Sequence, residues 1–157
     1  MSEERMHPRA CVALIAHDSK KGDLIEFARC HLEYLSGCEV VATEATARVL
    51  RQRLGLEAVA VKAGPAGGDV QIGARIVAGG ISAVFFLRDA MTAQPHEADI
   101  LALLRLCDVC EVPYATNLAT ARLLARELFG CRTASSACAD IAAGFDASCC
   151  QPLQAEA

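Results

Sequence analysis

No stretch of this sequence is long and apolar enough to cross a lipid bilayer. The longest strongly apolar run, Ile81 to Leu87, is far shorter than the roughly 20 residues that a membrane-spanning helix needs. The first residues, Met1 to His7, are too polar for a signal peptide. We therefore expect no membrane association and a cytoplasmic location.

The sequence also lacks a basic stripe, an internal repeat and a linker. Its 19 acidic residues outnumber its 15 basic residues, and the formal net charge is −4, so nucleic acid is not an expected partner. Apolar residues make up 54% of the chain and charged residues 22%, which is typical of a globular protein. We expect one domain over residues 1–157, with a core at about residues 10–130 and a divergent C-terminal segment at 131–157.

Cysteine, in contrast, is abundant. The chain has nine cysteines, and without an export signal we expect them to be reduced. Cys107 and Cys110 form a CxxC pair late in a predicted helix, and Cys149 and Cys150 are adjacent. We interpret both pairs as small apolar side chains and as thiols without a chemical role. Metal binding or redox switching by either pair is the open alternative.

Short apolar runs alternate with amphipathic segments along the chain. Cys11 to Ala16 is apolar at every position, as in a strand that is buried on both faces. Four further strands are predicted at 39–42, 58–61, 81–87 and 112–115, and helices at 21–36, 43–54, 69–78, 99–110 and 119–129. This alternation predicts an α/β fold, a three-layer, doubly wound, Rossmann-like sandwich with a mainly parallel five-stranded sheet.

Reactive side chains follow the carboxyl ends of these strands, where such sheets bind ligands. His17 follows the first strand, Thr43 the second and the turn Gly64 to Asp69 the third, while His96 lies beyond the fourth. A glycine-rich turn that opens a helix collects anions on its backbone N–H groups. An anion site beside two carboxylates and a histidine suits proton abstraction from a small phosphorylated substrate.

Five stretches, in the same order, resemble the methylglyoxal synthase family. They extend over residues from about 10 to 125, roughly three quarters of the chain, and they read ALIAHD (13–18), GPAGGD (64–69), PHEAD (95–99), LLRL (103–106) and VPYATNLATA (112–121). The resemblance implies a Rossmann-like α/β fold, in agreement with the strand and helix pattern.

The resemblance also implies an activity. It implies a lyase that converts dihydroxyacetone phosphate to methylglyoxal and inorganic phosphate, a bypass of glycolysis, with no cofactor and no metal. Asp69 matches the catalytic base, His96 the histidine that polarises the carbonyl, and Asp99 a second carboxylate of the site.

Further matches concern binding and assembly. His17 and Lys21 match substrate-binding positions, and the phosphate site corresponds to Thr43, Glu44, Ala45, Thr46, Ala63 and Gly64. Asp18 and Asp89 match supporting positions. The resemblance further implies a homohexamer that inorganic phosphate inhibits.

The chain departs from the family pattern at the phosphate site. Ala63 stands where the family usually has serine, which removes one hydroxyl donor, and Glu44 either repels phosphate or faces solvent. Ala90 replaces a common proline, and no basic segment follows Arg132. These departures predict weaker and less cooperative inhibition by phosphate.

Other interpretations remain open at this point. Asp69 and Asp99 can each cap a helix, His96 can be a loop residue, and Lys20 and Lys21 can be solvated charge. A ligand-sensing module of the same fold is one alternative function. A metal-dependent hydrolase is another, with hard-cation ligands drawn from His17, Asp18, Asp69, Asp89, His96 and Asp99. We interpret His7 and His31 as structural.

Overall fold

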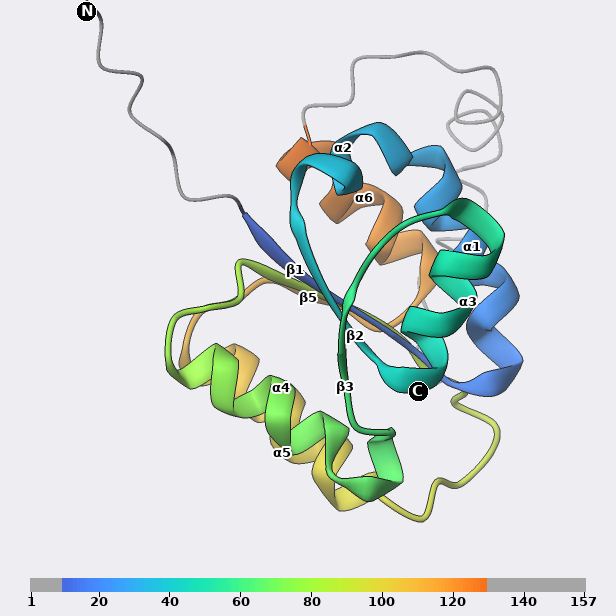
Figure 1. The fold of residues 1–157 in the computed structure, drawn as a ribbon. Coiled ribbons are helices and arrows are strands. Elements are labelled where there is room, and N and C mark those ends of the chain that lie inside the picture. The colour runs from blue at the N-terminus through green and yellow to red at the C-terminus, as the bar shows by residue number, and fades with distance from the viewer. Residues whose placement is uncertain (1–9, 130–157) are drawn as a thin grey trace, which may run out of the picture.

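The computed structural model describes residues 10–129, which form a parallel sheet between two layers of helices (Figure 1). The strands are β1 (Cys11–Ala16), β2 (Glu39–Thr43), β3 (Val59–Val61), β4 (Ala83–Leu87) and β5 (Tyr114–Ala115). Their order in the sheet is β3-β2-β1-β4-β5, and every neighbouring pair is parallel. The predicted α/β fold is therefore confirmed. The expectations for residues 130–157, for His7 and for the Cys149–Cys150 pair lie outside the described residues.

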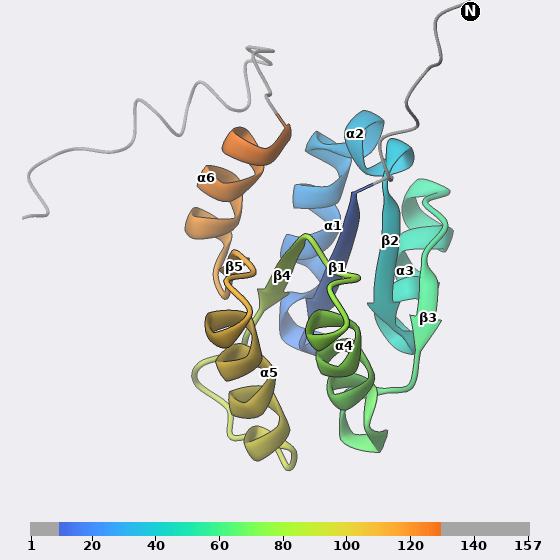
Figure 2. The same cartoon turned by 90° about the vertical axis from the view of Figure 1, so that its left-hand side faces the viewer.

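The helices divide between the two faces of the sheet (Figure 2). One face is covered by α1 (Lys21–Cys30), α2 (Leu32–Gly37), α3 (Glu44–Leu54) and α6 (Leu118–Phe129). The other is covered by α4 (Gly68–Val77) and α5 (Glu97–Val109). Two short 3-10 turns, Asp18–Lys20 and Gly64–Ala66, follow β1 and β3. Among residues 10–129, no helix has the length and the apolar character needed to span a membrane.

Strand β1 shows why an unbroken apolar run was needed. All six of its residues are buried. Leu14 belongs to the core beneath α1, α3 and α6, whereas Ala13 and Ile15 belong to the core beneath α4 and α5. Since successive side chains of a strand point to opposite faces, a strand with helices on both sides has no position for a polar residue.

The predicted helix at 21–36 is interrupted at His31, and this prediction was wrong in that detail. His31 has φ −118° and ψ 19°, which ends α1 and lets α2 start at Leu32. Its buried ring lies 4.9 Å from the ring of Phe27 and 5.6 Å from that of Phe129, between ring centroids. Burial lowers the pKa of His31, and the residue is structural, as its position on an apolar face indicated.

The predicted site residues follow the carboxyl ends of the strands, and the chain reverses its direction of winding between two of these strands, β1 and β4. From β1 the chain winds outward to β2 and β3, and it then returns to the other side of β1 as β4. The segments that follow β1 and β4 stay joined at their start, where the His17 N–H donates to the Leu87 carbonyl at 3.2 Å. Such a switch point opens a crevice at the carboxyl ends of the strands.

Candidate active site

A cavity of about 230 Å³ opens at this switch point. Its lining comes from the ends of β1, β2 and β4, from the segments after β1, β2 and β3, and from the connection after β4. The residues are Ile15, Ala16, His17, Asp18, Lys21, Thr43, Ala45, Ala63, Gly64, Pro65, Asp69, Phe86, Gln94 and His96. Nine of the residues that the sequence singled out therefore meet in one cavity: His17, Asp18, Lys21, Thr43, Ala45, Ala63, Gly64, Asp69 and His96.

Asp69 is the buried acid of this cavity. It lies in the first turn of α4 with 1% of its surface exposed, and neither carboxylate oxygen has a hydrogen-bond partner within the described residues. Its Oδ2 lies 3.3 Å from Nε2 of His96, within ion-pair distance. Burial raises the pKa of Asp69, the charge of Asp99 raises it further, and His96 opposes both effects. A desolvated carboxylate with a raised pKa is suited to accept a proton.

Two glycines of the turn allow this approach. A Cβ at Gly64 would lie 2.8 Å from Nε2 of His96 and 3.2 Å from Oδ2 of Asp69, in the space between the two groups. A Cβ at Gly68 would lie 1.9 Å from the Lys62 carbonyl oxygen, which no side chain can tolerate. Gly67, between them, has φ +97°, a conformation that favours glycine. The glycine-rich turn is therefore a steric requirement of the site.

His17 presents a hydrogen-bond donor at the same cavity. Its Nδ1 accepts the backbone N–H of Asp89 at 2.9 Å, so in the neutral ring the proton resides on Nε2. Burial lowers the pKa of His17, and the nearby His96 and Arg88 lower it further. Nε2 is buried without a hydrogen-bond partner within the described residues. A neutral imidazole with a free N–H can therefore polarise a substrate oxygen.

Lys21 and Thr43 supply further polar groups to the cavity lining. Lys21 is mostly buried, with 18% of its side chain exposed, and it forms an ion pair with the exposed Asp18. Thr43 lines the cavity, and its hydroxyl donates to that of Thr46 at 3.1 Å. Thr46 is buried behind Thr43 and does not line the cavity. Of the two threonines predicted at the phosphate site, Thr43 lines the cavity, and Thr46 orients the Thr43 hydroxyl through their hydrogen bond.

Three predicted carboxylates lie outside the cavity lining. The Glu44 side chain is 61% exposed and accepts from Arg48 at 3.2 Å, so it faces solvent rather than the cavity. Asp89 accepts from the Ser19 hydroxyl at 2.9 Å and from the Met91 N–H at 3.0 Å, and its own N–H binds His17. Asp99 is half-buried and acts on the site through its charge on Asp69. Asp89 and Asp99 thus support the site rather than line it.

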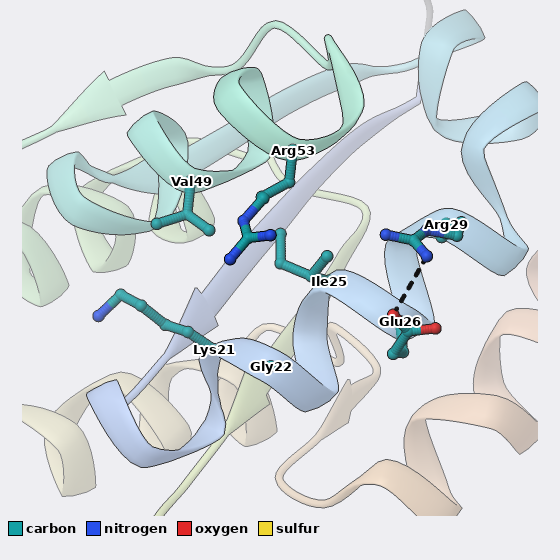
Figure 3. Close-up of a pocket in the computed structure, with 7 residues that line it drawn as sticks. All are labelled: Lys21, Gly22, Ile25, Glu26, Arg29, Val49 and Arg53. Atoms are coloured by element: carbon teal, nitrogen blue, oxygen red, sulfur yellow. Dashed lines mark ion pairs between the residues drawn. The ribbon is translucent and has the colours of Figure 1, made fainter.

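A second groove lies between α1 and α3 (Figure 3). Lys21 borders both cavities, and Arg53 reaches across Ile25 in this one (Figure 3). The one carboxylate of its lining, Glu26, forms an ion pair with Arg29 at 3.4 Å. This groove contains no histidine in its lining, so the cavity at Asp69 is the candidate active site.

The surroundings of the CxxC pair and of the acidic residues bear on the thiol and metal alternatives. Burial raises the pKa of Cys107 to about 11, and Cys107 and Cys110 are both free thiols. The Cys107 thiol therefore stays protonated at neutral pH, as expected of an idle thiol. Within residues 10–129, no three or more His, Cys, Asp or Glu residues are grouped so that they could hold a metal ion.

Sequence reasoning missed four residues near the reacting groups. Gln94 and Phe86 line the cavity, and Arg88 and Glu97 form a partly buried ion pair at the ends of the connection after β4. Gln94 lies two positions before His96, and that proximity was the available signal. The Arg88–Glu97 pair joins residues nine apart, and no local pattern predicts it.

Comparison with known proteins gives a consistent result. The family model described as MGS-like domain matches residues 23–116. The methylglyoxal synthase of Cupriavidus taiwanensis is 54% identical over 119 residues, which cover 76% of this chain and 90% of that protein. That of Carboxydothermus hydrogenoformans is 51% identical over 117 residues, which cover 74% and 97%. The crystal structure of methylglyoxal synthase from Elizabethkingia anophelis matches with a TM-score of 0.70 at 40% identity, over 74% of this chain and 77% of that chain.

The parallel sheet, the cavity at its switch point and the domain match define an α/β protein with an MGS-like domain. At these levels of identity and coverage, the chain belongs to the methylglyoxal synthase family, and it is an enzyme of the lyase class. The resemblance found in the five sequence stretches is thereby confirmed.

The Gly64→Ala variant tests the geometry of the turn. Because its Cβ would lie 2.8 Å from Nε2 of His96, the imidazole must move away from Asp69. A misplacement of a catalytic group by about 1 Å can cost about 100-fold in rate. We expect kcat to fall by about that factor, measured by steady-state kinetics. Gly37→Ala, where a Cβ meets nothing within 4 Å, is the matched control; equal activity of both variants would contradict the steric requirement.

Proposed function

We propose that this protein converts dihydroxyacetone phosphate to methylglyoxal and inorganic phosphate, with Asp69 as the base. The observation that carries the proposal is the buried Asp69 carboxylate, unpaired by hydrogen bonds within the described residues and 3.3 Å from the His96 imidazole in a cavity. The family relatives named methylglyoxal synthase support the same activity.

The phosphate end of the substrate fits the side of the cavity lined by Lys21 and Thr43. Thr43 precedes α3, and its side chain does not cap that helix. The N–H groups in the first turn of α3 are therefore open to an anion, and the helix dipole favours negative charge there. The Lys21 ammonium adds a positive charge, and Gly64 lines the same cavity.

The reacting end fits the side with Asp69 and the two histidines. Asp69 removes a proton from the hydroxymethyl carbon, and the carbonyl oxygen takes up the negative charge of the enediolate. The Nε2–H of His17 and the ring of His96 stabilise that oxygen, which is the main source of rate in such a step. Because the groups are fixed before the substrate arrives, little reorganisation is needed.

Phosphate then leaves from the neighbouring carbon. The hydroxyl of the enediolate passes its proton to the leaving phosphate and its electron pair forms the aldehyde, while the carbon–carbon double bond shifts and the carbon–oxygen bond to phosphate breaks. The resulting enolate, which still carries the negative charge on the former carbonyl oxygen, takes a proton at its terminal carbon and becomes methylglyoxal. The phosphate site must therefore hold the breaking bond out of the plane of the enediolate.

We expect the purified protein to release phosphate and methylglyoxal from dihydroxyacetone phosphate in buffer that contains a chelator. Asp69→Asn removes the base and is expected to lower kcat by at least about 100-fold. Activity is measured by trapping the dicarbonyl product. An Asp69→Asn variant as active as the wild type would refute the mechanism, and a wild type without activity on this substrate would favour a ligand-sensing module.

The melting temperature provides the control for folding. Because the pKa of Asp69 is raised in the folded state, ionisation of this group opposes folding. The penalty is absent at a pH below the carboxyl's value in the unfolded chain and develops as the pH rises through the folded value. Asp69→Asn should therefore melt no lower than the wild type, with a larger advantage at about pH 8 than at about pH 4.

Ala63→Ser should tighten the binding of inorganic phosphate. Ala63 lines the cavity, so serine adds a hydroxyl donor where the family usually has one. A hydrogen bond to a charged group is worth about 1.5–3 kcal/mol, or at least about a tenfold lower inhibition constant. The wild type is expected to show weak inhibition with little cooperativity.

Inhibition curves with inorganic phosphate measure both quantities. Ala66→Ser adds a hydroxyl to the same turn at an exposed position outside the cavity lining, and it should leave the inhibition constant unchanged. Equal inhibition of Ala63→Ser and wild type, or a strongly sigmoidal wild-type curve, would count against this assignment of the phosphate site.

The same family membership supports a homohexamer. Apolar side chains remain exposed on both helices of the second face, among them Val70 and Val77 on α4 and Leu101 and Val109 on α5. Apolar surface left over after the core is formed is commonly buried between copies of a chain. Light scattering at micromolar concentration is expected to give the hexamer mass, and a monomer there would contradict the proposal.

A further inference from the structure

The connection between β4 and α5 carries groups that contact both histidines. It starts at Arg88, whose N–H donates to the Thr116 carbonyl at 3.1 Å, and it ends at His96. Its middle has no support from the core, since Met91 is 95% exposed and its neighbours Thr92 and Ala93 are exposed as well. The position of the connection must therefore be fixed at its two ends.

An ion pair joins those ends. The Arg88 guanidinium donates through Nη2 to Oε1 of Glu97, the first residue of α5. The Arg88 side chain is only 24% exposed, and its Nε is buried without a partner in the described part of the chain. Glu97 is also held by its N–H, which donates to the Gln94 carbonyl at 3.2 Å. This pair differs from ordinary surface pairs because its cation is largely removed from water.

Each member of the pair is a chain neighbour of a group in the site. Asp89 follows Arg88, and its backbone N–H binds Nδ1 of His17 at 2.9 Å, which leaves the proton of that ring on Nε2. His96 precedes Glu97, and its Nε2 lies 3.3 Å from Oδ2 of Asp69. A shift at either end of the connection therefore moves an imidazole relative to the base.

We propose that Arg88 and Glu97 are positioning residues, whose ion pair closes the 88–96 connection and thereby sets the orientation of His17 and His96 at the cavity. Neither residue lines the cavity, so both act through their neighbours. The proposal rests on the proposed function for its kinetic consequences. Its geometric part concerns the two imidazoles and holds for any ligand of this cavity.

The kinetic test compares Arg88→Met, Glu97→Gln and the double variant with dihydroxyacetone phosphate as substrate. Loss of orientation should lower kcat by about 10- to 100-fold in each single variant, with KM changed less than kcat. Because both changes break the same interaction, the double variant should be no slower than the slower single variant. Arg88→Lys keeps the charge and one donor, and it should retain more activity than Arg88→Met.

Histidine ring nitrogens, followed by nuclear magnetic resonance through a pH titration, give a second readout. His17 is faced by His96, Arg88, Asp89 and Glu97, and the positive charge of Arg88 lowers its pKa whereas Glu97 raises it. Arg88→Met should therefore raise the pKa of His17, and Glu97→Gln should lower it. These opposite shifts report the two charges, whereas loss of orientation is measured by the tautomer of the neutral His17 ring. If Nδ1 is released from the Asp89 N–H, the ring proton should no longer reside on Nε2 alone in either single variant.

The exposed pair Arg51 and Glu57, 2.8 Å apart at the end of α3, provides matched controls. Arg51→Met and Glu57→Gln should leave kcat and the titration of His17 unchanged. Circular dichroism and melting curves check that every variant is folded.

The inference is overturned if both single variants keep kcat within about twofold of wild type, if the double loss equals the product of the single losses, or if the neutral His17 ring keeps its proton on Nε2 in both single variants as it does in the wild type. A wild type inactive on this substrate would reject the proposed function instead. In that case the tautomer of His17 in the single variants still decides the geometric part.

Discussion

A buried carboxylate meets an imidazole in this protein because two positions of one turn carry no side chain. At Gly64 a Cβ would occupy the space between Asp69 and His96, and at Gly68 it would collide with the Lys62 carbonyl. The turn follows β3 and leads directly into α4, so the same few residues end a strand, start a helix and place the acid. The rest of the cavity is arranged around that contact.

The sheet supplies the frame in which this contact has chemical use. Strands β1 and β4 are buried on both faces, and every residue of each is covered. The groups at their carboxyl ends therefore start from fixed points, and His17 and the 88–96 connection emerge side by side. Rigid strands beneath exposed segments are a common way to combine accurate placement with freedom to bind a ligand.

Much of this arrangement could be predicted from the sequence. The apolar runs at 11–16 and 81–87 and the glycine-rich turn indicated the parallel sheet and its functional edge, because these signals are local. The break at His31 could not be predicted, since it depends on the packing of its ring against Phe129, far along the chain. The outward direction of Glu44 follows from its pairing with Arg48 one helical turn later, a spacing that the sequence does contain. The Arg88–Glu97 pair depends on how a nine-residue separation closes in space, which pattern alone does not determine.

The side chains that line the cavity bear on whether the proposed product can modify the enzyme covalently. Within the described residues, that wall contains neither arginine nor cysteine, although the chain is rich in both. The proposed product is a dicarbonyl compound, and such compounds modify guanidinium and thiol groups covalently. Within the same residues, the one amine of the wall belongs to Lys21, which forms an ion pair with Asp18. Such a wall offers the proposed product no guanidinium or thiol group to modify, and we expect modification first at exposed side chains elsewhere, such as Arg53 in the neighbouring groove.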